Sequence, residues 1–461
     1  MANLLKRSQQ QKAAPVRIVH LGLGNFLRAH LAWYTQHAPD GGDWGIAAFT
    51  GRRPQAAEIL APQEGLYTLI TRAPDGDQFE TITTLSAVHP ADDHEQFLTY
   101  LRDENIAILS LTVTEAGYRR AANGHLDVSD ADVRTDISTL RTNPAAQVTT
   151  TPAKVLAGLI ARFQSGAGAI TVVPCDNLPQ NGSATATVIE DLAAAIEIER
   201  FAPGFNQWLK QNVSFVTTMV DRITPGISDE DRDAVTAELS VTDASPVVTE
   251  PFSEWVLSGN FPAGRPQWEQ AGVQIVENVE PYEQRKLLFL NGAHSLMAYA
   301  ATALGHETVF DAISDEQVRA WVEALWDDAA ACLDLPGTEI SEYRKALISR
   351  FENKRMRDVL GRIAADGSQK IPVRIVPPTR KAREEGHIPT GAVAALAGWI
   401  AHLRGHGVPV NDPAGEHWQQ LATRDEGEAT ARVIAELMPE LSDDAQLRDA
   451  VLNTLQSITR D

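Results

Sequence analysis

Apolar and polar residues follow two different patterns along the chain, and the change comes near residue 280. In the first part, short apolar runs rich in β-branched residues are separated by longer stretches with helical periodicity. The expected strands lie at 16–19, 44–50, 105–114, 169–177 and 214–225. Strands that alternate with helices form mostly parallel, doubly wound sheets. We therefore predict an α/β fold for this part.

Beyond residue 280 the pattern is almost entirely helical. The expected helices lie at 283–304, 314–333, 338–352, 354–366, 389–405 and 426–457, and residues 377–389 ("PPTRKAREEGHIP") are expected to form a loop. We predict an α/β domain over residues 1–275 and a mainly α-helical domain over residues 276–461. The polar residues 1–15 are expected to be a frayed, disordered tail.

Length and charge narrow the class of protein. A chain of 461 residues exceeds what one hydrophobic core usually supports, which agrees with two domains. The formal net charge of -21 opposes binding to nucleic acid or to an anionic membrane. The expected partner is therefore a small molecule, and we expect a monomer or a weak homo-oligomer.

Cysteine usage and the absence of long apolar runs indicate a cytoplasmic protein. Cys175 and Cys332 lie far apart in the sequence and form no CxxC or Cys/His array, so neither a disulfide framework nor structural zinc is expected. The first 15 residues lack the apolar segment of a secretory signal. No apolar run reaches the roughly 20 residues that a transmembrane helix needs.

A glycine-containing turn follows the first expected strand. In "HLGLGNFLRAH", Gly22 and Gly24 lie where a strand gives way to a helix, as in dinucleotide-binding turns, although Leu27 replaces the third glycine. The alternative is an ordinary tight turn. After the second strand, "TGRRPQ" offers Arg52 and Arg53 instead of an acidic residue for the ribose 2′-hydroxyl. Either arginine could hold a 2′-phosphate or be merely solvated, so NAD and NADP both stay open.

Polar residues interrupt the apolar helix that begins in "PYEQRKLLFLNGAHSL". In a regular α-helix, Glu283, His294 and Asn291 would lie about 60°, 80° and 140° around the axis from Lys286. A solvated polar face is one interpretation. The other is a sheltered group in which a lysine acts as general base while an amide and an imidazole stabilise an alkoxide-like oxygen. That set suits hydride removal from a secondary alcohol without a metal.

Two alternatives remain for these residues and for the chain. Tyr282 and Lys286 form YxxxK, the spacing of short-chain dehydrogenases, although such enzymes are much shorter than this chain and end soon after the pair. The chain could also be a binding protein that senses a sugar or a dinucleotide and has lost turnover. An intact lysine, asparagine and histidine set argues against the second alternative.

Along nearly its whole length the sequence resembles the long-chain polyol dehydrogenases, the family of mannitol 2-dehydrogenase and fructuronate (mannonate) reductase. The resemblance is carried by the segments "GLGNFLRAH", "LAPQEGLYTL", "TVTEAGY", "PCDNLPQNG", "MVDRITP", "GRPQWE" and "PYEQRKLLFLNGAHS". It implies a Rossmann-type domain followed by a helical domain, with the active site between them. It also implies a zinc-independent, NAD(P)-dependent oxidoreductase that interconverts a polyol or aldonate with a ketose or keto-uronate.

The resemblance also implies roles for individual residues. Lys286 resembles the general base, and Asn291, His294 and Asn177 resemble the residues that hold the reacting oxygen. Glu283 resembles a proton relay to solvent, and Asp221 a second acidic residue near the lysine. The implied substrate-binding residues are Arg362 and Lys370, and the implied cofactor-binding residues are Gly22, Gly24, Asn25, Phe26, Arg28, Arg52, Thr114 and Glu115.

The sequence departs from the family pattern in two places. "TGRRPQ" lacks the aspartate with which mannitol dehydrogenases prefer NAD, which leaves the choice of nicotinamide open. "PFSEWVLSGNF" lacks an acidic pair, which affects either the substrate or only a surface. "DGSQKIP" is closer to the fructuronate reductase side of the family than to the mannitol side, but it does not decide the substrate.

Overall fold

The computed structural model describes residues 3–460 and divides into two compact units. The first unit is Met1–Glu280 and the second is Pro281–Asp461. The predicted boundary lies after residue 275, within a few residues of this division.

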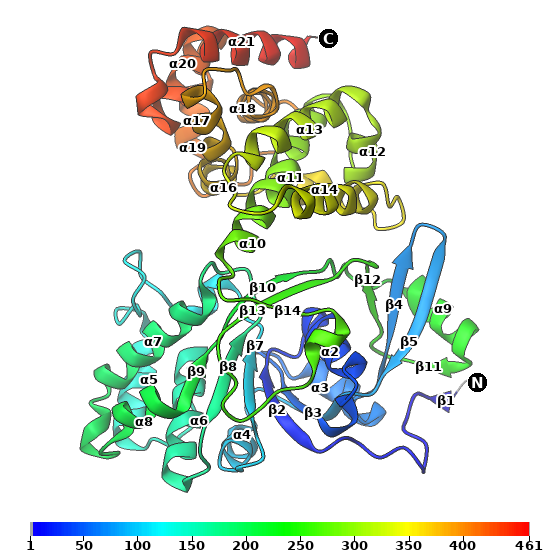
Figure 1. Ribbon diagram of the computed structural model, residues 1–461, viewed down its shortest axis with the longest axis vertical. Coiled ribbons are helices and arrows are strands. Elements are labelled where there is room, and N and C mark those ends of the chain that lie inside the picture. The colour runs from blue at the N-terminus through cyan, green and yellow to red at the C-terminus, as the bar shows by residue number, and fades with distance from the viewer. Residues whose placement is uncertain (1–2, 461) are drawn as a thin grey trace. The chain divides into compact units, whose positions relative to one another are not determined.

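A six-stranded parallel sheet forms the centre of the first unit (Figure 1). Its strands, in spatial order, are β6 (Leu85–His89), β3 (Gly45–Phe49), β2 (Val16–Leu21), β7 (Ile108–Leu111), β8 (Ile170–Pro174) and β9 (Val213–Phe215). The order reverses between β2 and β7, and ligands of such sheets bind outside the carboxyl ends of the strands at this point. The prediction of a doubly wound α/β fold is confirmed.

Alternate residues of the strands feed two separate hydrophobic cores. Val19 and Leu109 belong to one core, and their neighbours Ile18 and Ile108 belong to the other. The first core includes residues of α4 (His94–Leu101), α5 (Ala131–Thr142), α6 (Thr151–Ser165), α7 (Asn181–Ala195) and α8 (Phe205–Asn212). The second includes residues of α1 (Asn25–Ala29), α2 (Leu31–His37) and α3 (Gln55–Leu60). Burial on both faces explains why these strands are apolar runs without alternation.

Smaller sheets complete the first unit. One sheet consists of β12 (Val247–Thr249), β4 (Tyr67–Ala73) and β5 (Gly76–Ile82), and another of β10 (Thr217–Asp221), β13 (Glu254–Ser258) and β14 (Gln274–Ile275). A third sheet pairs β1 (Asn3–Leu4) with β11 (Val241–Thr242), and the helix α9 lies at Asp229–Leu239. The strand predicted at 214–225 is therefore wrong as one element. Its first part forms the edge strand β9, and the chain then leaves that sheet and pairs through β10 with β13.

The tail predicted over residues 1–15 is ordered from residue 3 onward. Strand β1 pairs with β11, and the Arg7 guanidinium donates hydrogen bonds to the carbonyls of Thr83 (2.8 Å) and Leu85 (2.9 Å). These contacts join distant parts of the chain, so the polar composition that suggested fraying does not reveal them. Residues 1 and 2 of that prediction lie outside the described residues.

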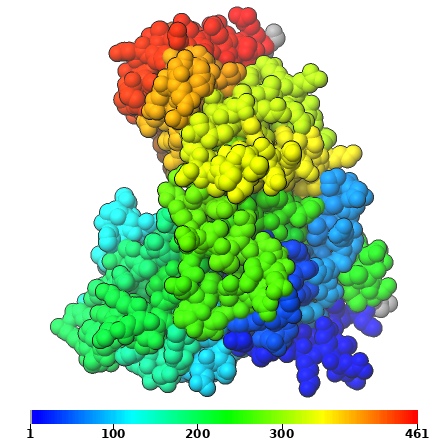
Figure 2. Space-filling model, viewed as in Figure 1, coloured from blue at the N-terminus to red at the C-terminus, as the bar shows by residue number. Residues whose placement is uncertain are grey.

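The second unit is helical. Its helices are α10 (Glu280–Arg285), η6 (Lys286–Asn291), α11 (Gly292–Leu296), η7 (Met297–Ala301), α12 (Val309–Ser314), α13 (Glu316–Ala330), α14 (Gly337–Phe351), α15 (Leu360–Ile363), α16 (Gly367–Arg374), α17 (Val376–Glu384), α18 (Thr390–Leu403), α19 (Gly415–Ala422), α20 (Glu426–Leu437) and α21 (Ala445–Thr459). Helix α10 begins at the last residue of the first unit. The helices α20 and α21 form the red part of the surface in Figure 2.

Three predicted elements of this unit differ from the structure. The helix expected at 354–366 is reduced to the short α15, and the helix expected at 426–457 is interrupted at Met438 and Pro439. The loop expected at 377–389 is largely the helix α17. Prolines at the first helical positions explain the last error, because the missing N–H groups are not needed there.

Helix α18 is the core of the second unit, and every residue from Gly391 to Leu403 is buried. A Cβ atom added to Gly391 would lie 2.2 Å from the backbone nitrogen of Leu325, and one added to Gly398 would lie 2.4 Å from that of Ala300. The two glycines therefore allow close packing against α13 and η7. Within residues 3–460, no helix is both long enough and apolar enough to cross a membrane.

We expect Arg162 to be indispensable for the stability of the first unit. Its side chain is buried, and it donates to the carbonyls of Leu101, Asp103, Ala167, Gly168 and Ala169. Replacing Arg162 by Met leaves these acceptors without the charged donor, so the free energy of unfolding should fall by about 3 kcal/mol or more. Urea unfolding measures this loss. The same change at the exposed Arg134 of α5 is the control and should cost little.

Candidate active site

The glycine turn after β2 is closed on one side and open on the other. Gly22 has a φ of +118°, and a Cβ atom there would lie 2.3 Å from the carbonyl oxygen of Thr112 in the loop after β7. Beside Gly24, by contrast, a Cβ atom would meet only the carbonyl oxygen of Gly22, at 3.8 Å. The turn therefore packs tightly on the sheet and leaves its outer side accessible to a ligand, and this geometry fits the pyrophosphate of a dinucleotide.

Arg28 holds this turn in place. Its buried guanidinium donates to the carbonyl oxygen of Ser245 (2.6 Å), to the side-chain oxygen of Asn25 (2.7 Å) and to the carbonyl oxygen of Gly24 (3.3 Å). Phe26 stacks on His30 with 4.8 Å between ring centroids. Arg28 and Asn25 were predicted to bind the cofactor. Their hydrogen bonds within the protein shape the turn that would hold it.

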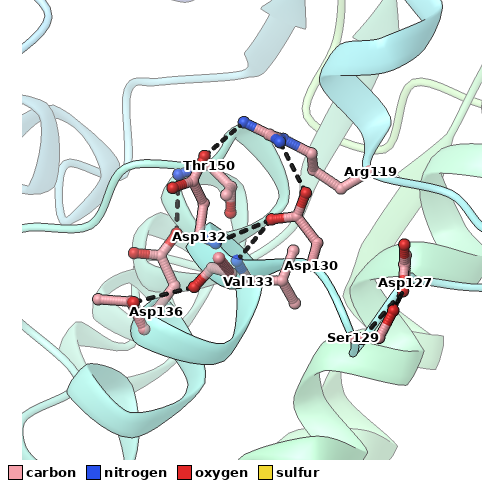
Figure 3. A network of polar contacts seen from close by, with 10 residues as sticks. Arg119, Asp127, Ser129, Asp130, Asp132, Val133, Asp136 and Thr150 are labelled. Atoms are coloured by element: carbon pink, nitrogen blue, oxygen red, sulfur yellow. Dashed lines mark hydrogen bonds and ion pairs between the residues drawn. The ribbon is translucent and has the colours of Figure 1, made fainter.

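The loop after β7 carries Thr114 and Glu115, and both are exposed. A charged network fixes the chain beyond them (Figure 3). Arg119 donates to Asp130 (2.8 Å) and to Asp132 (2.7 Å), and Asp130 in turn caps α5. The network therefore anchors the far end of the segment that begins with the two candidate residues.

Asn177 follows β8 and is exposed, whereas the residue before it is buried. The hydroxyl of Tyr118 donates to the carboxylate of Asp176, and the backbone N–H of Leu178 donates to the same carboxylate (3.1 Å). Burial raises the pKa of Asp176 to about 6, although these hydrogen bonds oppose the rise. Asp176 thus joins the loop that bears Asn177 to the loop after β7.

Two further residues of the first unit, the predicted site residue Asp221 and the cysteine Cys175, are buried. Asp221 is the last residue of β10 and is buried, in register with Glu254 on β13. Cys175 is fully buried at the end of β8, and burial raises the pKa of its thiol well above the ordinary value. A buried, protonated thiol is a small packing group and a poor nucleophile.

The lysine, asparagine and histidine of the second unit lie on an irregular helix. Residues Lys286–Asn291 form the π-helical turn η6, and α11, which carries His294, continues directly from it. A π-helix bonds residues five apart and turns less per residue than an α-helix, so Asn291 lies closer in angle to Lys286 than the roughly 140° of a regular helix. The angles predicted for Asn291 and His294 assume a regular α-helix and are therefore wrong. All three side chains are half-buried.

Two side chains from other helices support the π-helical turn. The indole N–H of Trp326 donates to the carbonyl oxygen of Phe289 (3.0 Å), and the Arg374 guanidinium lies 3.4 Å from the carbonyl oxygen of Asn291 and 3.2 Å from the hydroxyl of Ser295. Burial lowers the pKa of Arg374 to about 10. Side chains inserted in this way donate hydrogen bonds to carbonyls that do not follow the regular ladder of an α-helix.

The two predicted substrate-binding residues differ in their surroundings. Lys370 lies on α16, which packs on η6 and α11, and its amine donates to the carbonyls of Ile363 (3.1 Å) and Ala365 (2.5 Å). Burial lowers the pKa of Lys370. Arg362 lies on α15, is 71% exposed and pairs with Asp358 at 2.8 Å. In residues 3–460, no group of three or more His, Cys, Asp or Glu is placed to hold a metal ion.

Three residues that shape these sites were not predicted from the sequence: Asp176, Trp326 and Arg374. Asp176 had a signal, because a carboxylate directly after an apolar strand needs a partner if it is buried. Trp326 and Arg374 had none, because they act on backbone carbonyls that lie 37 and 83 residues away in the chain.

Comparison with known protein families covers both units. Residues 16–270 match the model of the mannitol dehydrogenase Rossmann domain, and residues 278–459 match the model of the mannitol dehydrogenase C-terminal domain. The chain is 34% identical over 443 residues to the D-mannonate oxidoreductase of Escherichia coli strain K12. The aligned region spans 93% of this chain and 89% of that protein.

Solved structures show the same architecture. A substrate-free D-sorbitol dehydrogenase superposes with a TM-score of 0.88 at 30% identity, over 99% of this chain and 98% of the other. The mannitol 2-dehydrogenase of Pseudomonas fluorescens, solved as a ternary complex with NAD and D-mannitol, gives a TM-score of 0.78 at 32% identity, over 99% and 94% of the two chains.

We expect Asp176 to make stability depend on pH. The folded carboxyl keeps its proton up to about pH 6, whereas an unfolded aspartate loses its proton near pH 4. The folded state therefore binds more protons in this window, and the contribution of Asp176 to stability falls as pH rises through it. As pH rises from about 4.5 to about 7.5, the free energy of unfolding of the unsubstituted protein should fall by about 2 kcal/mol relative to that of D176N. Urea titrations measure it, and D75N, at an exposed aspartate, should show no such trend.

Proposed function

Because the chain belongs to the mannitol dehydrogenase family, we propose that it is an oxidoreductase that interconverts a polyol or aldonate with the corresponding ketose or keto-uronate. The hydride acceptor or donor is NAD or NADP. The observation that carries this proposal is the π-helical turn η6, which starts at Lys286 and ends at Asn291. This turn brings the positions of a basic group and an amide donor closer in angle than a regular helix would, with His294 on the helical turn that follows.

Lys286 acts as the general base in the proposed reaction. Its amine takes the proton of the substrate hydroxyl during oxidation and returns it during reduction. The nicotinamide, when bound, supplies the hydride chemistry. Asn291 and His294 donate hydrogen bonds to the substrate oxygen, which gains negative charge as the proton leaves. Glu283 lies one helical turn before Lys286 and passes the proton on to solvent.

Residues of the first unit keep the roles that family resemblance implies for them. Asn177 is exposed after β8 and donates a further hydrogen bond to the reacting oxygen. Asp221 serves, together with Glu283, as one of the two acidic residues of the proposed site. The open side of the Gly22–Gly24 turn accepts the pyrophosphate, and Thr114 and Glu115 lie on the neighbouring loop at the point where the strand order reverses.

Substrate hydroxyls or a carboxylate bind to Arg362 and Lys370 in this proposal. Lys370 supports it best, because its helix α16 packs on the helical segment of Lys286 and Asn291. Its two carbonyl contacts hold the amine in one place. Arg362 would have to release Asp358 in order to reach a substrate.

We also propose that the protein works in the cytoplasm as a monomer or weak homo-oligomer, with no metal in the reaction. Cys175 and Cys332 are both free thiols, which agrees with a reducing compartment.

A substrate panel tests the reaction. The purified chain is mixed with fructose, fructuronate or tagaturonate and with NADH or NADPH, and the absorbance of the reduced nicotinamide is followed. At least one pair should be turned over, and dialysis against EDTA should leave the rate unchanged. Nicotinamide binding without turnover across the panel would indicate a sensor instead of an enzyme.

Replacing Lys286 by Met should lower kcat by about 100-fold to 10,000-fold, because the general base is lost while the helix keeps a side chain of similar length. Steady-state kinetics measure kcat, and fluorescence titration of the reduced nicotinamide should show unchanged cofactor binding.

The matched control is Tyr282→Phe. It keeps the ring that stacks 5.2 Å from the Arg285 guanidinium and removes only the hydroxyl. Near-normal activity of Y282F is expected. If Y282F and not K286M abolished turnover, the short-chain type of chemistry would replace the one proposed.

A further inference from the structure

A small pocket lies at the carboxyl ends of β3 and β6 in the first unit. Its volume is about 250 Å³, which is less than most complete ligand sites and enough for one part of a ligand. Gly51 and Arg52 line it from the loop after β3, and Ala91 and Asp92 from the loop after β6. In dinucleotide-binding sheets, the loop after the second strand meets the adenosine ribose.

Two cations from distant parts of the sequence line this pocket. Arg52 is exposed and comes from the loop after β3, whereas Lys154 is half-buried in the first turn of α6. The Lys154 amine donates to the carbonyl oxygen of Ala91 (3.0 Å), which fixes it at the pocket wall. Arg53, the neighbour of Arg52, is not among the lining residues.

The start of α6 brings charge of both signs to the pocket, because Lys154 lies near the carboxylates of Asp136 and Asp92. Thr149 lines it just before the start of α6, and the carboxylate of Asp136 accepts the backbone N–H groups of Thr149 (3.0 Å) and Thr150 (2.7 Å) (Figure 3). The amino-terminal end of a helix carries a partial positive charge, and the carboxylate of Asp136 offsets part of it here. Asp92 is the opposing charge in the lining, and it is exposed. Gly51 leaves the approach clear, because a Cβ atom there would meet nothing within 4 Å.

We propose that Arg52 and Lys154 form a subsite for the 2′-phosphate of NADP(H), so that the protein prefers NADP(H) over NAD(H). This inference rests on the proposed function for the identity of the whole ligand, but the subsite is defined by residues of the first unit alone. Arg52 supplies a planar donor fork and Lys154 a compact charge, and both kinds of donor bind phosphate. The loop after β3 offers no carboxylate for the ribose 2′-hydroxyl of NAD.

Isothermal titration calorimetry of the full chain with adenosine fragments tests the subsite without any turnover. The probes are 2′,5′-ADP, which carries the 2′-phosphate, and 5′-AMP, which lacks it. We expect 2′,5′-ADP to bind about tenfold or more tightly than 5′-AMP, since two charge-assisted contacts are added. Equal or weaker binding of 2′,5′-ADP would overturn the proposal and point to Asp92 as a partner of the ribose hydroxyls.

Single substitutions measure the contribution of each cation to 2′,5′-ADP binding. R52Q and K154Q should each reduce 2′,5′-ADP affinity about fivefold or more and leave 5′-AMP affinity unchanged, whereas R53Q should change neither. K154R keeps the charge and should retain most of the preference, which guards against a folding defect in K154Q. If R53Q weakened 2′,5′-ADP binding as much as R52Q, the assignment of this pocket would be wrong.

The outcomes also distinguish this proposal from the proposed reaction. Tight 2′,5′-ADP binding without turnover of any sugar would support the subsite and contradict the reaction. Turnover with equal kcat/KM for NADH and NADPH would support the reaction and contradict the subsite. Inorganic phosphate at the same concentration should not displace 2′,5′-ADP, and full displacement would reduce the pocket to a general anion site.

Discussion

Hydrogen bonding of the backbone in an irregular helix controls the chemistry proposed for this protein. A π-helical turn is rare because its carbonyls and N–H groups do not follow the regular ladder, and such turns occur frequently at functional sites. Here the turn from Lys286 to Asn291 is supported by Trp326 from α13 and Arg374 from α16. These two donors stabilise a turn in which Lys286 and Asn291 are closer in angle than in a regular helix.

In the first unit, buried arginines provide the hydrogen-bond donors for backbone carbonyls of loops. Arg28, Arg162 and Arg222 are all buried, and each donates to backbone carbonyls of segments that are distant in the sequence or in loops. A buried guanidinium is costly unless its donors are used, so these residues fix loops in defined positions. The glycine turn beside Arg28 depends on this support, since the turn itself contains few side chains.

Parallel sheet topology explains why the candidate cofactor residues of the first unit lie at one edge. The carboxyl ends of β2, β3, β7 and β8 meet there, and each is followed by a loop that carries candidate residues. Asp176 adds a link between two of these loops through Tyr118.

Local sequence determined the type of most elements and the identity of the main candidates. Apolar runs located β2, β3, β7 and β8, the glycines located the turn after β2, and the spacing of Lys286, Asn291 and His294 indicated the proposed chemistry, because each of these signals lies within a few residues. Tertiary structure decided the π-helical phase and the approach of Lys154 to the loop of Arg52. Those features depend on contacts between residues tens of positions apart, which no local periodicity can encode.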